Sequence, residues 1–256
     1  MSVYTTEIAS DHLVSDNPIH QRLLKAYYVS EAYINGHLLE VGCGEGRGID
    51  LLAPKATSYT AVDKISEVIE KLSNNYPDGK FIQANIPPFP FEDESFDTLV
   101  SFQVIEHIKD DVTFLKEIHR VLKPGGVALV STPNIKMTLS RNPWHIREYT
   151  AQQLTQLAQG IFGKVEMKGI AGNEKVMQYY DENKASVNRI MKYDILNLQY
   201  RLPAALLRIP YEILNRRNRN KLQASDNSLV TSIEHEDYLL SDNPETSLDL
   251  FAILTK

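Results

Sequence analysis

The fold of this 256-residue chain is decided by residues 38–48, which read Leu38-Leu39-Glu40-Val41-Gly42-Cys43-Gly44-Glu45-Gly46-Arg47-Gly48. An apolar run containing one acid passes into a loop in which four of seven residues are glycine. This pattern predicts a parallel strand that ends in a tight turn, because glycine permits backbone conformations closed to other residues and lets a ligand approach the main chain. We therefore expect a ligand-binding loop at the carboxyl end of this strand.

The spacing of the glycines distinguishes between classes of ligand. A dinucleotide fingerprint has glycine at the first, third and sixth loop positions, but the sixth position here is Arg47, and no Gly-Lys-Ser/Thr phosphate loop follows. Glu40 would repel a phosphate, yet it suits a ligand that carries an amino group and a sulfonium. Asp63 ends the next apolar run after the glycine loop. A carboxylate at that strand end can accept both hydroxyl protons of a ribose.

At this point the chain resembles the class I S-adenosylmethionine-dependent methyltransferases, in particular the small-molecule branch that includes ubiquinone-biosynthesis enzymes. Ordered blocks over residues 38–134 carry the resemblance: Phe81-Ile82-Gln83-Ala84-Asn85-Ile86, Val100-Ser101-Phe102-Gln103-Val104-Ile105-Glu106-His107 and Leu122-Lys123-Pro124-Gly125-Gly126-Val127. The resemblance implies an α/β fold with a Rossmann-like, doubly wound, seven-stranded sheet. The sheet should be mostly parallel with an antiparallel last strand, helices on both faces and a helical insertion before the final strand.

Periodicity predicts alternating strands and helices through the same region, which is typical of a parallel sheet covered on both faces. We expect strands at 37–41, 58–63, 79–83, 97–102, 126–132 and 164–169, and helices near 46–53, 66–75, 110–122 and 151–160. The last strand, Ser247 to Thr255, alternates apolar residues and should be half exposed. The roughly 75 residues before it should form helices near 174–200 and 204–219, broken at Pro203 and Pro210.

We interpret the chain as one methyltransferase domain over residues 1–256. Its parts are an N-terminal helical cap (1–36), a cofactor-binding core (37–134), an acceptor-side loop, helix and strand (135–173), a basic helical insertion (174–245) and the last strand (246–256). Cys43 is the only cysteine, so no intrachain disulfide can form. The N-terminus lacks a basic and apolar leader and no run approaches 18 apolar residues, so we expect a cytoplasmic protein.

The resemblance assigns S-adenosylmethionine as the cofactor and S-adenosylhomocysteine as the product. Backbone at Gly42, Cys43, Gly44 and Gly46 would pass beside its amino-acid moiety and ribose. Glu40 and Asp63, with Lys64 next to it, would bind polar groups of the cofactor. Two alternatives stay open, because Glu40 can also cap a neighbouring loop and Asp63 can cap the helix that starts near Ser66.

Two further strand ends complete the expected cofactor site. Asn85 stands where the family commonly has an aspartate for the adenine amino group, so its side-chain oxygen and the Ile86 backbone would bind the base more weakly. Phe102 and Gln103 would lie near the methionine portion, the former by apolar contact and the latter through its carbonyl. A purely structural role suits Phe102 equally well.

The acceptor is expected beside residues 141–150, Arg141-Asn142-Pro143-Trp144-His145-Ile146-Arg147-Glu148-Tyr149-Thr150. His145 could take a proton from an acceptor hydroxyl and Tyr149 could orient it, whereas in the alternative Trp144 and Tyr149 seal the loop and His145 bonds to backbone. His107, in a Glu-His pair frequent in the family, is either a base or a hydrogen-bonded strut. We expect no metal, because Glu234-His235-Glu236-Asp237 reads as a solvated loop and the Asp-Asp-Asn set of magnesium-dependent methyltransferases is not evident.

Charge is distributed unevenly along the chain. Residues 184–221 hold nine Lys/Arg and two acids, a net +7, which leaves −13 on the rest of a chain whose net charge is −6. This basic amphipathic segment is a lid, a membrane surface (through 201–221) or a seat for an acidic acceptor. The acidic remainder disfavours nucleic acid.

The predicted function is methylation, at oxygen rather than nitrogen, of a small-molecule or lipid- or glycan-linked acceptor. The rivals are a cofactor-binding interaction protein without transfer activity and a nicotinamide oxidoreductase, which the Gly46 spacing disfavours.

Overall fold

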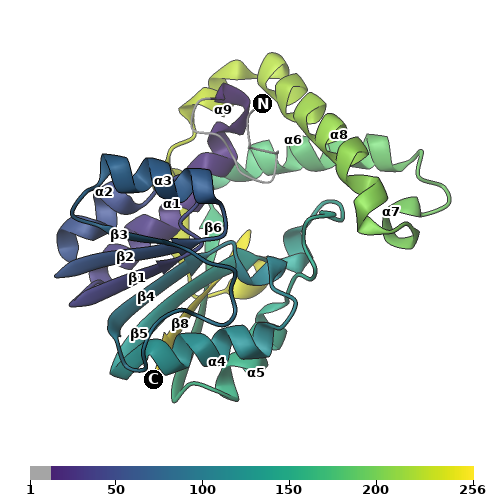
Figure 1. The fold of residues 1–256 in the computed structure, drawn as a ribbon. Coiled ribbons are helices and arrows are strands. Elements are labelled where there is room, and N and C mark those ends of the chain that lie inside the picture. Colours follow the sequence, from purple (N-terminus) through teal and green to yellow (C-terminus); the bar gives the residue numbers. More distant parts are fainter. Residues whose placement is uncertain (1–12) are drawn as a thin grey trace.

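A computed structural model of the protein describes residues 13–256, so the first twelve residues of the expected N-terminal cap lie outside the described part (Figure 1). Among the described residues the sheet has eight strands, in the order β3-β2-β1-β4-β5-β8-β6-β7. Their bounds are β1 His37–Val41, β2 Ser58–Asp63, β3 Lys80–Gln83, β4 Phe96–Phe102, β5 Leu122–Pro133, β6 Lys164–Gly172, β7 Tyr238–Ser241 and β8 Asp249–Thr255.

The sheet has the predicted doubly wound arrangement. Strands β1 to β5 pair in parallel, and β8 pairs antiparallel with both β5 and β6, which confirms the expected antiparallel last strand. The prediction of seven strands was wrong by one. The additional strand, β7, is only four residues long and pairs with β6 at the sheet edge. It lies in the segment assigned to the helical insertion, and so short a strand leaves little periodicity in the sequence.

Helices cover both faces of the sheet (Figure 1). One face packs against α1 (Asn17–Ser30), α2 (Ile49–Leu52) and α3 (Ser66–Asn75), and the other against α4 (Asp111–Val121) and α5 (Ala151–Gln159). Side chains alternate between the faces along each strand, so Leu38 joins the first hydrophobic core and Leu39 the second. Both leucines are fully buried.

The strand order reverses between β1 and β4, which are neighbours in the sheet although two strands separate them in sequence. Ligands of open α/β sheets bind outside the carboxyl ends of the strands at such a reversal. The glycine loop follows β1 and the segment from Gln103 to His107 follows β4. The two loops touch, since a Cβ placed on Gly42 would lie 2.3 Å from Cγ2 of Val104.

The insertion contains α6 (Glu174–Met191), α7 (Leu198–Arg201), α8 (Ala204–Ser225) and α9 (Asn227–Ser232). The predicted helix over 174–200 is divided because Asn197 has a left-handed backbone (φ 55°), which interrupts the helical turn before α7. The Asp194 carboxylate accepts from the first amides of α7, those of Leu198 (2.6 Å) and Gln199 (3.1 Å). Pro203 precedes α8 as predicted, but the expected break at Pro210 was wrong. Pro210 lies in the exposed first half of α8, where water can satisfy the carbonyl that loses its amide partner.

Strand β8 is buried on both faces, and the expectation of a half-exposed last strand was wrong. It lies between β5 and β6, and every residue from Asp249 to Leu254 is buried. Leu250 and Leu254 face the second core, while Phe251 and Ile253 face the first. Asp249, also buried, pairs with Arg22 of α1 across 3.1 Å (Nε to Oδ2), which compensates a carboxylate inside the sheet.

Candidate active site

The glycine loop after β1 has the backbone conformation that its sequence predicts. Gly42, Gly44 and Gly46 have φ of 79°, 49° and 83°, in the left-handed region. A Cβ on Gly46 would strike Leu72, whereas a Cβ on Gly44 would have no described atom within 4 Å. The main chain at Gly44 therefore borders open space, where a ligand can reach it.

Asp63 joins this loop to the end of β2. Its Oδ2 accepts from the Gly44 amide and its Oδ1 from the Ile65 amide, each at 3.0 Å. Asp63 does not cap α3, because its Oδ1 binds the amide of Ile65, which precedes the first helical residue, and α3 has no side-chain cap. Each carboxylate oxygen has a second lone pair, and Asp63 is only half buried, so both oxygens retain capacity for ligand hydroxyls.

Glu40 is 1% exposed and is held by two tyrosines. The Tyr27 hydroxyl donates to Oε1 at 2.8 Å, and the Tyr59 hydroxyl donates to Oε2. Burial raises the pKa of Glu40 to about 7, although both hydrogen bonds oppose that shift. Sequence reasoning missed these partners, because they come from two other elements, α1 before the acid and β2 after it.

The other predicted cofactor residues vary in exposure. Lys64 and Asn85 are exposed, and Ile86 and Gln103 are half buried. Phe102 is 8% exposed and packs edge-on against Tyr27, with ring centroids 4.9 Å apart, which favours its structural alternative. Cys43 is buried as well, and burial raises the pKa of its thiol, so it packs rather than reacts.

A second cluster follows β4 and contains His107 and His145, whose rings meet edge to face with centroids 5.0 Å apart. The Nδ1 atom of His107 lies 3.0 Å from the Trp144 carbonyl oxygen, and Nδ1 of His145 lies 2.6 Å from Oε1 of Glu148. Burial, and then the neighbouring His145, lower the pKa of His107 to about 4. His107 is therefore neutral at physiological pH, and the strut alternative fits its contact with Trp144.

Tyr149 does not line the cavity that the two histidines line, and it binds α4 instead. It is 5% exposed, and its hydroxyl donates to Asp111 at the start of α4 (2.8 Å). Burial, followed by this hydrogen bond to Asp111, raises the pKa of Tyr149. Arg147 also pairs with Asp111, so these two residues fasten the loop to α4 and do not line the cavity described next.

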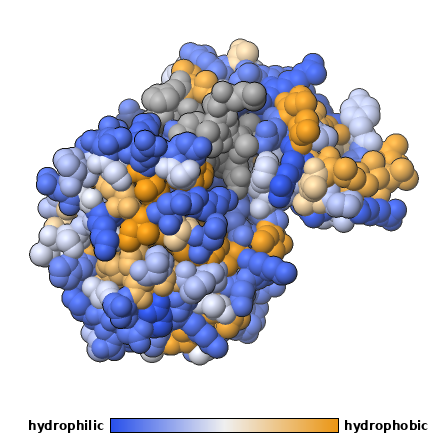
Figure 2. Space-filling view, viewed as in Figure 1, coloured by the Kyte–Doolittle hydropathy of each residue, from blue (hydrophilic) through white to orange (hydrophobic). Residues whose placement is uncertain are grey.

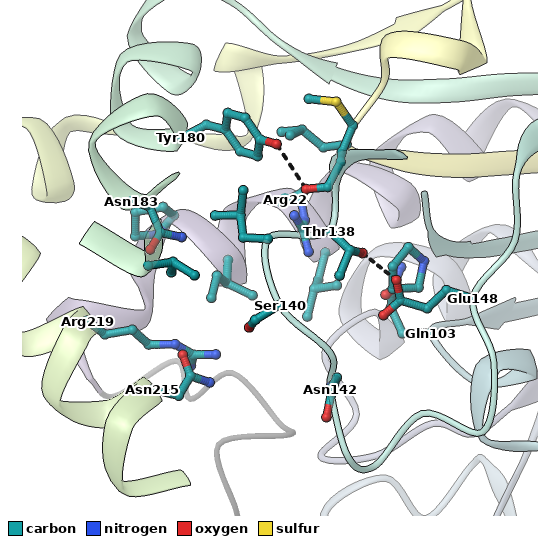
Figure 3. Close-up of a pocket in the computed structure, with 18 of the residues that line it drawn as sticks. Arg22, Gln103, Thr138, Ser140, Asn142, Glu148, Tyr180, Asn183, Asn215 and Arg219 are labelled. Atoms are coloured by element: carbon teal, nitrogen blue, oxygen red, sulfur yellow. Dashed lines mark hydrogen bonds between the residues drawn. The ribbon is translucent and has the colours of Figure 1, made fainter. Parts of the chain in front are cut away.

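The histidines open into a cavity of about 260 Å³ between the sheet and the insertion (Figure 3). Gln103, Glu106 and His107 line it from the segment after β4, and residues 137–148 line it from the loop after β5. Figure 3 shows Tyr180, Asn183, Asn215 and Arg219 facing this loop, with Arg22 of α1 between the two sides. The contributions of α6 and α8 were missed in the sequence, because helical periodicity does not reveal which element a helix will cover.

Comparisons with known proteins agree with this arrangement. Residues 39–130 match the family model described as a methyltransferase domain. A probable S-adenosylmethionine-dependent methyltransferase of Mycobacterium tuberculosis is 43% identical over 126 residues, which cover 47% of this chain and 46% of that protein. Residues 39–130 of the chain therefore form a methyltransferase domain.

Two further relatives of the methyltransferase domain are informative. A fatty-acid O-methyltransferase of Mycolicibacterium smegmatis is 29% identical over 134 residues, covering 50% of this chain and 49% of that protein. The structure of an S-adenosylmethionine-dependent methyltransferase of Thermotoga maritima aligns with a TM-score of 0.59 at 15% identity, covering 93% and 92% of the two chains, and shows the shared fold. The chain spans about half the length of the curated relatives it matches first.

The insertion of the methyltransferase domain docks on the loop after β5. The Arg208 guanidinium lies 4.0 Å from the ring centroid of Trp144, and the Tyr180 hydroxyl donates to the Met137 carbonyl at 3.0 Å. At its other end, Arg216 (2.7 Å) and Arg219 (3.1 Å) pair with the fully buried Asp16. Part of the net positive charge of residues 184–221 is therefore structural, and these contacts fit the lid alternative.

Proposed function

We propose that this chain methylates a hydroxyl group of a small-molecule or lipid- or glycan-linked acceptor. S-adenosylmethionine, when bound, supplies an electrophilic methyl group on a sulfonium. The observation that carries the proposal is the open space at Gly44, beside Asp63, at the same carboxyl edge of the sheet from which His107 lines the cavity. Asp63 would bind the ribose, and the Gly44 backbone would border the cofactor.

On the acceptor side, His145 is the candidate base. The Glu148 carboxylate accepts a hydrogen bond from Nδ1 of His145, so this nitrogen carries the proton and Nε2 carries the lone pair of the imidazole. The Asn142 amide donates to that lone pair at 2.8 Å. An acceptor hydroxyl that displaced Asn142 would find a proton acceptor already oriented. The cavity would hold the acceptor and exclude water, which is the main catalytic requirement of a displacement between positioned partners.

A lipid-linked acceptor is supported by the surface of the insertion. The side chains of Tyr193, Ile195 and Ile209 are 88%, 88% and 72% exposed, and Leu206 and Ile213 add to the same end of the insertion. Figure 2 shows apolar residues gathered on these projecting helices. No helix within residues 13–256 is long and apolar enough to span a bilayer.

Exposed cations accompany this apolar surface, namely Lys192, Arg201, Arg208 and Arg217. A surface that combines apolar side chains with cations binds the interface of an anionic membrane. The apolar side chains enter the acyl region, and the cations pair with the headgroups. We therefore propose peripheral membrane contact through residues 201–221, and the name of the fatty-acid O-methyltransferase relative supports a lipid acceptor.

The test of cofactor binding uses two glycines with matched backbone strain. Gly44 and Gly125 both have positive φ, and a Cβ on either would meet no described atom within 4 Å, but Gly125 precedes the buried part of β5, far from the crevice. Calorimetric titration with S-adenosylmethionine should show that Gly44→Ala weakens binding at least tenfold while Gly125→Ala does not. Equal affinities in both variants would contradict the proposed site.

The test of transfer separates the enzyme from the rival interaction protein. Wild-type protein incubated with labelled methyl donor and lipid extract should yield S-adenosylhomocysteine and a labelled product. Retention of the donor without product, over many acceptors, would favour the interaction protein.

The test of membrane contact compares two exposed isoleucines, Ile209 in the insertion and Ile146 outside it. Sedimentation with vesicles containing phosphatidylserine should fall several-fold in Ile209→Glu relative to Ile146→Glu. Equal sedimentation of both variants would contradict the contact through 201–221.

A further inference from the structure

Three potential metal ligands converge where the segment after β4 meets the loop after β5. Glu106, His107 and His145 each offer one donor atom, and these atoms all lie within 4.8 Å of one another. All three residues also line the cavity. The cluster forms because the loop returns over the end of β4, with the Ile146 amide donating to the Glu106 carbonyl at 2.8 Å.

The carboxylate of Glu106 is incompletely satisfied. The side chain is fully buried, and Oε2 accepts from the Thr132 hydroxyl at 2.9 Å, but Oε1 has no hydrogen-bond partner among the described residues. Buried carboxylate oxygens are nearly always paired, because an unpaired one forfeits its hydration without compensation. A cation beside Oε1 would supply the missing partner.

Both imidazoles have the orientation of metal ligands. The Trp144 carbonyl can only accept a hydrogen bond, so Nδ1 of His107 carries the proton and Nε2 carries the lone pair. Glu148 imposes the same tautomer on His145. Metal-binding histidines are usually held in this way, with the nitrogen that does not bind the metal donating to a carbonyl or a carboxylate.

We propose that Glu106, His107 and His145 bind a divalent transition-metal cation of the manganese, cobalt or zinc class. Two imidazole nitrogens and one carboxylate suit these ions, whereas magnesium and calcium prefer sites built from oxygen. The amide of Asn142 donates to Nε2 of His145 and would have to move aside, so removal of this amide should favour the cation. The remaining coordination positions would face the cavity.

The catalytic role of this metal site depends on the proposed function, methylation of a hydroxyl group. A cation there would bind the acceptor through a hydroxyl oxygen and lower the pKa of that hydroxyl, whose proton would leave to solvent as the acceptor enters the cavity and before water is excluded. His145 would then act as a ligand of the cation and not as a free base. Acceptors with an oxygen donor next to the methylated hydroxyl would be favoured, since they can bind the cation with two atoms.

The sequence did not reveal this site. Our expectation of no metal came from a search for acidic clusters and for the Asp-Asp-Asn set, whereas Glu106 and His145 stand far apart in the sequence and have no metal-binding spacing of their own. Only the return of the loop after β5 brings them together.

The test measures the binding of metal ions in the absence of methyl donor and acceptor, so that its outcome is independent of methyl transfer. Chelator-treated protein comprising residues 1–256 should bind Mn²⁺ with 1:1 stoichiometry by calorimetry and bind Mg²⁺ at least tenfold more weakly. Glu106→Gln and His145→Ala should each weaken Mn²⁺ binding at least tenfold. Asn142→Ala should bind as tightly as wild type or more tightly, and His37→Ala, on the exposed start of β1, should bind as wild type.

A spectroscopic measurement on wild type keeps the proposal falsifiable if the variants fail to fold. Co²⁺ bound to two imidazoles and a carboxylate should show intense, shifted visible bands, and a spectrum identical to that of aqueous Co²⁺ would overturn the proposal. The absence of binding heat, or affinity unchanged in both Glu106→Gln and His145→Ala, would overturn it as well. If the site fails while S-adenosylmethionine still binds and product still forms, the proposed function stands without the metal.

Discussion

Replacement of Glu40 by glutamine should reverse its effect on stability between acidic and alkaline pH. Burial raises the pKa of Glu40 from 4.5 to about 7, so the folded protein holds this proton more tightly than the unfolded chain does. The stability contributed by the protonated form is fully present below pH 4.5 and is lost as pH rises through 7. At about 1.36 kcal/mol per pKa unit, the loss between pH 5 and pH 8 is about 2–3 kcal/mol.

Glutamine has the shape of glutamic acid and cannot ionise. One of its two polar atoms is an amide nitrogen, which cannot accept a hydrogen bond as either oxygen of the carboxyl group can, so Tyr27 or Tyr59 loses its acceptor at both pH values, at a cost of about 1 kcal/mol. The informative quantity is therefore the change with pH in the stability difference between Glu40→Gln and wild type. Because Glu106 titrates in both proteins, its contribution cancels.

Urea denaturation followed by circular dichroism at pH 5 and pH 8 measures this quantity. The stability of Glu40→Gln relative to wild type should increase by about 2–3 kcal/mol from pH 5 to pH 8. Glu70→Gln, at an exposed position of α3, controls for the loss of one negative charge and should show little pH dependence. A relative stability of Glu40→Gln that stays constant within about 0.5 kcal/mol would refute the argument that burial controls this carboxylate.

Three other predictions concern the crevice and the insertion. Asp63→Ala should weaken S-adenosylmethionine binding by about 1–3 kcal/mol through lost hydrogen bonds, and an unchanged dissociation constant in calorimetry would remove Asp63 from the site. His145→Ala should lower kcat by about 100-fold and change cofactor affinity little; undiminished turnover would exclude it from the reaction. Asp16→Asn should destabilise the protein by about 3 kcal/mol, because Arg216 and Arg219 lose a buried partner, and unchanged hydrogen exchange in α8 would show that this pair does not anchor the insertion.

The sequence alone determined the class of fold and the position and conformation of the glycine loop. Apolar runs that alternate with helical periodicity specify parallel strands and their covering helices, and the positive φ of Gly42, Gly44 and Gly46 follows from a tight turn that few other residues can make. Strand or helix type and the conformation of a tight turn depend on residues that are close together in the sequence. Errors arose where local patterns were weak or misleading, as in the short strand β7 and at Pro210.

Only the tertiary structure decided which polar groups meet. The hydroxyls that hold Glu40 come from α1 and β2, and the cluster of Glu106, His107 and His145 forms because the loop after β5 folds back over the end of β4. The cavity needs α6 and α8, which lie beyond residues 39–130 that match the family model. Contacts between residues far apart in sequence depend on how whole elements pack, and hydrophobic periodicity specifies the buried face of an element without specifying its partner.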